Sequence, residues 1–301
     1  MLDISAIILV YNEEIHIRRC LENLSGFVKQ VFIIDCYSQD KTVEIASGFD
    51  NVTVLQNKWV NHAVQFNWAL DNAPIMTKWV LRLDADEYLT EELKREMEER
   101  LPSLSDEYTG VTFPLRRVFL GRIIRRGGTG HIKMLRLFQY GKARSEVRMM
   151  DEHIELLEGK TIEFVGEFAD DNLNDLSWWT KKHVGYAIRE AVDLLDIEYG
   201  LTNSSEAEKQ QLLSPDAMSR RKRKLSYAKK PLFWRSFFYF CYRYFLKLGF
   251  LEGKEGFMWH FFQGWWYRTL VDAKVWEIKK ACGTDVNKMK AYLREKYHIE
   301  L

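Results

Sequence analysis

Two aspartates separated by one residue stand out in the segment RLDADEY, which runs from Arg82 to Tyr88. They follow an apolar run, and side chains two residues apart on an extended backbone point to the same side. Asp84 and Asp86 can therefore address one ligand. Paired carboxylates suit Mg²⁺ or Mn²⁺, which prefer oxygen ligands and complete their shell with substrate phosphates. The alternative is an acidic helix start, in which Asp86 and Glu87 favour the dipole of the following helix.

Another carboxylate, Asp35, ends an apolar run in the segment VFIIDCYSQDKT, which spans Val31 to Thr42. Four apolar residues precede Asp35, and a polar cluster typical of a turn follows it. A charged residue at the end of a buried strand is explained if that strand ends at the ligand-binding edge of a sheet.

The first hundred residues alternate β-branched runs with amphipathic stretches. This pattern predicts strands over 4–10, 30–35, 51–55 and 78–84, and helices within 13–24, 40–47 and 61–73. Strand and helix repeated in this way imply right-handed βαβ units and a mostly parallel sheet. Ligands of such sheets bind at the carboxyl ends of the strands, where Asp35 and Asp84 both lie.

The later elements change character along the chain. A helix is expected over 88–101 with Thr90 as its N-cap, followed by a strand-rich region from 108 to about 168. Nearly everything after about residue 175 is expected to be helical. The pattern therefore indicates two domains, residues 1–170 and 171–301.

Composition limits the classes of function. The chain has 301 residues, 47% of them hydrophobic and 29% charged, and a net charge of +1. This balance argues against a nucleic-acid partner, because such domains usually carry a large basic excess. The four cysteines lack metal-ligand spacing and indicate free thiols in a reducing compartment. The start of the sequence shows no secretory signal pattern, so we expect a cytoplasmic protein.

Four segments, AIILVYNEE, VFIIDCYSQDKT, QFNWAL and WVLRLDADE, occur in an order and at distances that resemble family 2 glycosyltransferases of the GT-A fold. The chain is similar to the bacterial subgroup that includes the β-1,4-glucosyltransferases of lipopolysaccharide core assembly, which share its RYFLKLGFLEGKEGF and QGWWYR tail. The resemblance implies an α/β fold, with a Rossmann-like, mostly parallel sheet flanked by helices and a helical, aromatic-rich C-terminal region. It also implies that residues 1–170 bind the nucleotide sugar and carry catalysis.

The resemblance assigns roles at the matching positions. Asp35 corresponds to the aspartate that contacts the uracil base, and Tyr11 and Glu13 lie beside the same pocket. Asp84 corresponds to the first aspartate of the DXD motif, near the ribose and the metal. Asp86 corresponds to the residue that coordinates Mn²⁺ or Mg²⁺ most directly.

Four further positions concern the donor pocket. This chain carries Cys36 and Tyr37 where the family commonly has Asp or Ser and then Gly, so Tyr37 adds bulk beside the nucleotide. Gln65 and Asn67 could face the sugar phosphate. They lie two residues apart on a helix, and hence on different faces, so we expect one of them to reach it.

Inverting sugar transfer needs a general base for the acceptor hydroxyl and stabilisation of the departing diphosphate. The segment MMDEHIE occupies the place where the family carries an acidic base, which implies Glu152 first and Asp151 second. His153 and His131 are candidates for a third metal ligand or an acceptor contact, or are hydrogen-bonded structural residues.

Arginines precede the glycines of the loop RRGGTG. Arg126, with Arg125, could meet a diphosphate or an anionic acceptor, and the alternative is a solvated loop end.

The C-terminal tail is rich in aromatic residues, with eighteen in the forty-four positions from Phe233 to Trp276. Arg235, Arg243 and Lys247 interrupt its first apolar run, which disfavours a transmembrane helix. The tail follows the basic run RRKRK, a combination typical of a surface that rests on an anionic leaflet. The alternative is that these helices pack on one another with their cationic stems reaching water.

The leading hypothesis is a metal-dependent, inverting glycosyltransferase that acts at the cytoplasmic face of the inner membrane. It would move a hexose from a nucleotide sugar, most simply a UDP-hexose, to a saccharide or lipid-linked acceptor in lipopolysaccharide or surface polysaccharide synthesis. The alternative hypothesis is a non-catalytic peripheral membrane scaffold with a degenerate transferase domain. A sugar nucleotidyltransferase is disfavoured because no glycine-rich, lysine-bearing phosphate loop follows the first strand.

Overall fold

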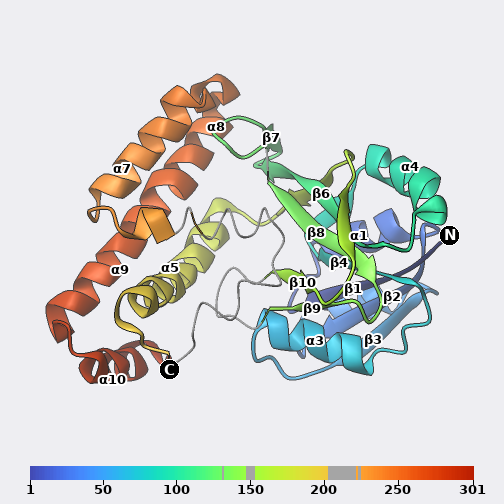
Figure 1. The fold of residues 1–301 in the computed structure, drawn as a ribbon, viewed down its shortest axis with the longest axis horizontal. Helices are drawn as coiled ribbons and strands as arrows, with labels where there is room; N and C mark the ends of the chain where they lie inside the picture. Colours follow the sequence, from blue (N-terminus) through green and yellow to red (C-terminus); the bar gives the residue numbers. More distant parts are fainter. Residues whose placement is uncertain (131, 147–152, 203–221, 223–224) are drawn as a thin grey trace. The chain divides into compact units, whose positions relative to one another are not determined.

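A computed structural model describes residues 1–130, 132–146, 153–202, 222 and 225–301. The chain divides into two compact units (Figure 1). The first comprises residues 1–125 and the described residues from 129 to 173, and the second comprises residues 126–128 and the described residues from 174 to 301. The short loop 126–128 therefore groups with a part of the chain that begins almost fifty residues later.

Four parallel strands form the start of the main sheet in the first unit. They are β1 (Leu2–Val10), β2 (Val28–Asp35), β3 (Val52–Gln56) and β4 (Trp79–Asp84), in the order β3-β2-β1-β4. The connecting helices are α1 (Ile17–Leu24), α2 (Thr42–Ala46) and α3 (His62–Asn72). The predicted α/β class with parallel βαβ units is confirmed.

Beyond β4 the sheet becomes mixed. It continues through β8 (Lys133–Gln139), which runs antiparallel to both β4 and β6 (Tyr108–Phe119). Strand β12 (Phe168–Asp171) then pairs parallel with β6, and β5 (Glu87–Leu89) pairs antiparallel with β12. Two short strands, β7 (Arg122–Ile124) and β11 (Lys160–Glu163), also pair with β6, and a separate ribbon joins β9 (Ala143–Ser145) to β10 (Ile154–Leu156).

The turn formed by Ala85 and Asp86 leads into strand β5 and not directly into a helix. Helix α4 (Glu91–Arg100) begins later, with the Thr90 side chain accepting the Leu93 N–H, and the 3-10 turn Leu101–Ser103 follows it. The predicted N-cap is thus confirmed. The alternative role of Asp86 as part of an acidic helix start is wrong, because β5 separates it from the first turn of α4.

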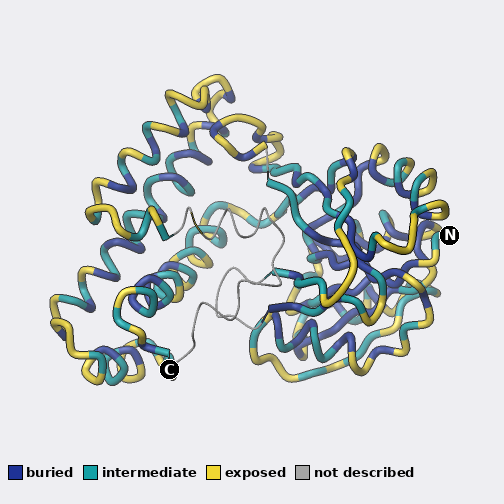
Figure 2. Tube along the Cα trace, viewed as in Figure 1, coloured by how far each residue is buried: buried dark blue, intermediate teal, exposed yellow. Residues whose placement is uncertain are grey.

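Strands β1, β2 and β4 are mostly buried on both faces, and Figure 2 colours much of this sheet as buried. On one face Ile8 of β1 shares a buried cluster with Ile17 and Leu21 of α1. On the other face Ile7 shares a cluster with Phe66 of α3. Burial on both faces explains why these strands read as continuous apolar runs, and it leaves polar groups a place only at the strand ends.

The described part of the second unit is helical. It contains α5 (Leu176–Tyr199), α7 (Trp234–Cys241), α8 (Gly253–Trp259), α9 (Tyr267–Cys282) and α10 (Val286–Tyr297), with π-helical stretches at Tyr242–Leu246 and His260–Trp266 and a 3-10 turn at Gly249–Glu252. Asp175 caps α5, and Gly200 ends it in the left-handed conformation. A core that includes Ala187 and Val271 joins α5 to α9. Of the helices described, none combines the length and apolarity needed to span a bilayer.

Candidate functional site

The register of the parallel strands brings the predicted aspartates to one edge of the sheet. Asp35 pairs with Val10, the last residue of β1, and Asp84 pairs with Leu9 on the other side of the same strand. Strand β1 lies between β2 and β4, so the loop that begins at Tyr11 leaves the sheet between them. The positions inferred from topology therefore converge.

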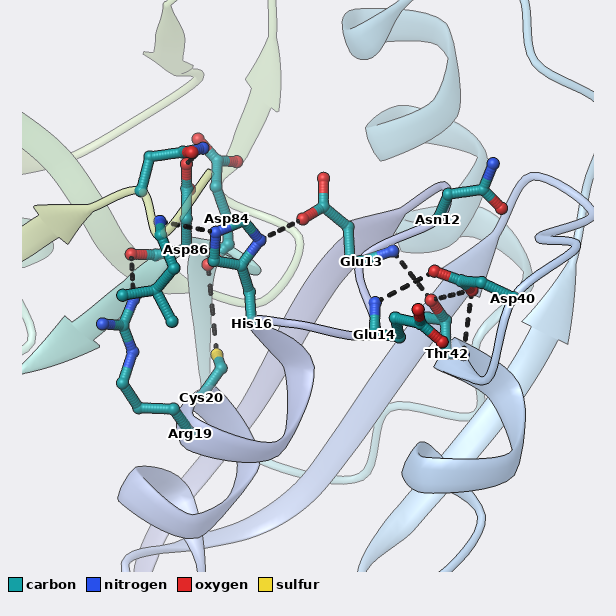
Figure 3. A network of polar contacts seen from close by, with 12 residues as sticks. Asn12, Glu13, Glu14, His16, Arg19, Cys20, Asp40, Thr42, Asp84 and Asp86 are labelled. Atoms are coloured by element: carbon teal, nitrogen blue, oxygen red, sulfur yellow. Dashed lines mark hydrogen bonds and ion pairs between the residues drawn. The ribbon is translucent and has the colours of Figure 1, made fainter. Parts of the chain in front are cut away.

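Hydrogen bonds tie the loop after β1 to the loop after β2 (Figure 3). The backbone N–H groups of Asn12 and Glu13 donate to the hydroxyls of Ser38 (2.9 Å) and Thr42 (2.7 Å). Asn12 accepts the Gln39 N–H in return at 2.8 Å. The polar cluster that follows Asp35 thus positions the segment that carries Tyr11 and Glu13.

Asp35 is fully buried, and its carboxylate is held from two sides. It accepts the Ser38 N–H at 3.0 Å and the Gln56 side-chain amide at 3.0 Å. Burial, together with the charge of Asp35, raises the pKa of the neighbouring Cys36 thiol to about 11. Tyr37 has φ +62° and is 54% exposed, so it adopts the backbone conformation that glycine favours and directs its ring outward.

Gln65 and Asn67 hydrogen-bond within the first unit. The amide nitrogen of the buried Gln65 donates to the Cys36 Sγ and the Asn57 carbonyl, both at 3.2 Å. Asn67 donates to the Ser145 carbonyl and accepts the Ser145 N–H, each at 2.9 Å. These contacts fix the end of β2 and strand β9 to helix α3.

Asp84 and Asp86 lie on a turn whose backbone is held at several points. The Asp84 N–H donates to Glu87 Oε2 at 2.9 Å, and the Asp84 side chain is 43% exposed. One Asp86 carboxylate oxygen accepts the Asn172 amide at 2.8 Å. The Asp86 carbonyl accepts from Arg19 at 3.2 Å and from the Asp171 N–H at 3.1 Å.

A buried ion pair supports this turn and was not predicted from the sequence. Arg136 donates to Glu87 Oε1 at 2.5 Å, and the two side chains are only 4% and 2% exposed. Burial raises the pKa of Glu87 well above its ordinary value, against the attraction of Arg136. The pKa of Asp170 is also raised, first by burial and then by the negative charges of Asp86 and Asp84. Arg136 within the apolar run IKMLRLFQ was the available signal.

Breaking this pair should destabilise the first unit. We expect Arg136→Met to lower the free energy of unfolding by about 3–5 kcal/mol, because it leaves the Glu87 carboxylate buried without its cation. Urea unfolding measures this. Lys133→Met, which removes one partner of the exposed Lys133–Glu163 pair, is the matched control and should cost about 1 kcal/mol or less. Equal losses in the two variants would contradict the account.

The donor groups at this edge suit a hard divalent cation only together with a ligand. Within the described ranges, no three or more His, Cys, Asp and Glu side chains come together as a metal site. Asp84 and Asp86 supply two carboxylates, which fits an Mg²⁺ or Mn²⁺ ion that takes its remaining ligands from a diphosphate and water. His153 lies instead beside Glu146, with 3.7 Å between Nδ1 and Oε2.

The remaining predicted residues lie elsewhere. Arg126 belongs to the second unit, where its backbone N–H donates to Glu252 at 2.7 Å. Arg125 stays with the first unit and pairs with Glu167 at 3.3 Å. The other three candidates fall outside the described residues: His131, Asp151 and Glu152.

Known proteins share this sequence pattern. The family model described as Glycosyl transferase family 2 matches residues 5–155. An uncharacterized glycosyltransferase of Rickettsia typhi is 28% identical over 170 residues, which are 56% of this chain and 57% of that protein. The lipopolysaccharide core biosynthesis glycosyltransferase LpsC of Rhizobium meliloti is 28% identical over 150 residues, 48% of this chain and 54% of LpsC. The chain thus spans little more than half the length of these two curated relatives.

Among solved structures, the mannosyltransferase PcManGT from Pyrobaculum calidifontis, in complex with GDP-Man and Mn²⁺, aligns with a TM-score of 0.46. Its sequence is 13% identical, and the alignment covers 91% of this chain and 87% of that one. S. aureus TarS 1-349 aligns with a TM-score of 0.43 at 15% identity, covering 99% and 91%. Since the family model spans half of the sequence and includes the strand ends that carry Asp35, Asp84 and Asp86, the chain belongs to glycosyl transferase family 2.

Proposed function

We propose that the protein is an inverting, metal-dependent hexosyltransferase. It uses a UDP-activated hexose and a saccharide or lipid-linked acceptor, in lipopolysaccharide or surface polysaccharide synthesis. The observation that carries the proposal is the convergence of Asp35, Glu13, Asp84 and Asp86 at the ends of three adjacent parallel strands. That edge is the ligand-binding edge of open parallel sheets.

The donor would lie across this edge. Asp35, at the end of β2, would face the base, and Tyr11 and Glu13 would line the same pocket. Asp86, with Asp84, would hold Mn²⁺ or Mg²⁺, which when bound acts as a Lewis acid on the diphosphate. The contacts from Asn172 and Arg19 would keep the Asp86 turn in place, so little reorganisation would be needed when the donor enters.

The acceptor hydroxyl must lose its proton as it attacks the anomeric carbon. We assign the general base to Glu152, with Asp151 second, on the strength of the family resemblance. A base in that place would accept the proton of the attacking hydroxyl. The acceptor oxygen would bond to the anomeric carbon as the bond between the sugar and the diphosphate breaks, and this direct displacement inverts the anomeric configuration.

Nucleotide affinity tests the proposed donor site. We expect Asp35→Ala to weaken UDP binding in the presence of Mn²⁺ by about tenfold or more, because a hydrogen bond to a charged group is lost. Isothermal titration calorimetry measures this, and thermal unfolding checks that the variant is folded. The matched control is Asp71→Ala. Asp71 lies on α3 and is an exposed partner of Arg144. Full UDP affinity in Asp35→Ala would reduce the segment after β2 to an ordinary turn.

We further propose that the second unit places the protein on an anionic membrane surface. Large apolar side chains are exposed along α7, the turns after it and α8, namely Phe233, Trp234, Phe238, Tyr242, Phe245, Leu246, Leu248, Phe250, Leu251 and Phe257. Figure 2 shows exposed stretches along α7 and α8. From Lys229 to Phe257 every exposed charged side chain is a lysine, since Glu252 is buried and Glu255 is half-buried. Aromatic groups bounded by cations are typical of interfacial binding.

Liposome flotation tests this surface. We expect the wild type to float with vesicles that contain anionic lipid, and less so at high salt. The double variant Phe238→Glu, Leu246→Glu should bind at least about a hundredfold more weakly, because each of these side chains contributes roughly 1.5–3 kcal/mol when buried. Met76→Glu, at an exposed apolar position of the first unit, is the control. A double variant that floats like the wild type would contradict membrane binding by this face.

A further inference from the structure

We infer that His16 is a positioning residue for the donor site, an inference that rests on the proposed function. It lies just before helix α1, and its ring is fully buried. The hydrogen bonds of its ring do not reach Asp84 or Asp86 directly. Its two ring nitrogens instead link Glu13, beside the proposed nucleotide pocket, to the segment Asp171–Leu173 that holds Asp86.

The contacts of His16 define which nitrogen carries the proton. Nε2 accepts the backbone N–H of Leu173 at 2.9 Å, so Nε2 carries no hydrogen. Nδ1, which lies 2.6 Å from Glu13 Oε2, must then be the donor to that carboxylate. The neutral Nδ1–H tautomer therefore satisfies both partners at once. His16 thus holds the Glu13 carboxylate in place, and Figure 3 shows this hydrogen bond.

The second arm of the link reaches Asp86 through the neighbours of Leu173. Asn172 donates its side-chain amide to the Asp86 carboxylate, and the Asp171 N–H donates to the Asp86 carbonyl. Arg19 is one helical turn after His16 on α1 (Figure 3). It donates to the Asp171 carboxylate at 2.7 Å and to the Asp86 carbonyl. One turn of α1 therefore holds both sides of the proposed donor site.

A purely structural role would not require this polarity. Burying an imidazole is costly unless both nitrogens are paired, and a leucine would fill a similar volume without that cost. A polar ring is needed at this position because it pairs with one carboxylate and one backbone group of the donor edge. The Nδ1 arm sets the Glu13 carboxylate, and the Nε2 arm sets the strand end that fixes Asp86.

Two substitutions separate the arms. The amide nitrogen of asparagine can take the place of Nδ1, and the amide oxygen of glutamine can take the place of Nε2. We expect His16→Asn to keep UDP affinity at saturating Mn²⁺ within about threefold, and to require about tenfold or more Mn²⁺ for half-saturation. His16→Gln should do the reverse. His16→Leu should lose both by about ten- to hundredfold.

Calorimetric titration of UDP at fixed Mn²⁺, and of Mn²⁺ at fixed UDP, gives the two affinities. Amide hydrogen exchange at Leu173 in the ligand-free protein gives an independent readout, which should speed up in His16→Asn and His16→Leu but not in His16→Gln. Asn23→Ala is the control, because Asn23 lies on the same helix and bridges to both backbone groups of Leu89 at 2.9 Å. It should lower stability and leave both affinities unchanged.

The outcomes are distinct. If the wild type binds no UDP, the proposed function fails and this inference fails with it. If the wild type binds UDP and the three His16 variants differ from Asn23→Ala in neither affinity, only the positioning role is overturned. The crossed pattern of the asparagine and glutamine variants would support it.

Discussion

Asp86→Ala is expected to lower sugar transfer by about a thousandfold. The carboxylate is proposed to hold the divalent cation against the departing diphosphate, and preorganised electrostatic stabilisation of that kind is worth about 10²- to 10³-fold or more. Release of UDP from a UDP-hexose, followed at several Mn²⁺ concentrations, measures the loss.

Asp86→Asn separates the charge from the structural contact. The Asn172 amide donates to an Asp86 carboxylate oxygen, and the amide oxygen of asparagine can accept the same hydrogen bond. We therefore expect Asp86→Asn to unfold like the wild type and still lose most of the transfer rate. Activity near the wild-type level in Asp86→Asn would show that the residue acts only as a support for the turn.

The second large effect is expected from the proposed base. Glu152→Gln should reduce turnover by about 10²- to 10⁴-fold while UDP affinity stays within about threefold, because the base acts on the acceptor and not on the nucleotide. Single-turnover measurements with saturating donor report the chemical step. Calorimetry with UDP on the same variant reports donor binding.

Asp151→Asn is the matched comparison, since it removes the neighbouring carboxylate. The variant with the larger loss in the chemical step identifies the base. Wild-type turnover in both variants would remove this segment from the mechanism. A loss of UDP affinity equal to the loss of turnover would move it to the donor site.

The first four strands could be predicted because their signals are local. Buried parallel strands need continuous apolar runs, and such runs end at Val10, Asp35 and Asp84. Strand β5 could not be found in this way. Its three residues pair with β12, where Leu89 lies opposite Phe168. No local sequence pattern predicts a contact between positions so far apart in the chain.

The acidic residues of the site could be predicted from the sequence, but the residues that pair with acidic side chains there could not. Topology places Asp35 and Asp84 at one edge whatever their neighbours are, whereas the pairing of Glu87 with Arg136 depends on which strand lies next to β4. The same holds for the loop 126–128, which groups with the helical unit through contacts such as that between Arg243 and the Gly127 carbonyl at 2.9 Å.

The proposed metal-dependent transfer from a UDP-sugar is tested by measuring UDP release with four donors: UDP-glucose, UDP-galactose, UDP-N-acetylglucosamine and UDP-glucuronic acid. Each is incubated with the wild type and with Asp86→Asn, with Mn²⁺ or with a chelator. We predict that the wild type releases UDP from at least one donor, and that the chelator and the substitution each remove most of this release. Absence of UDP release from all four, together with absence of UDP binding by calorimetry, would contradict it.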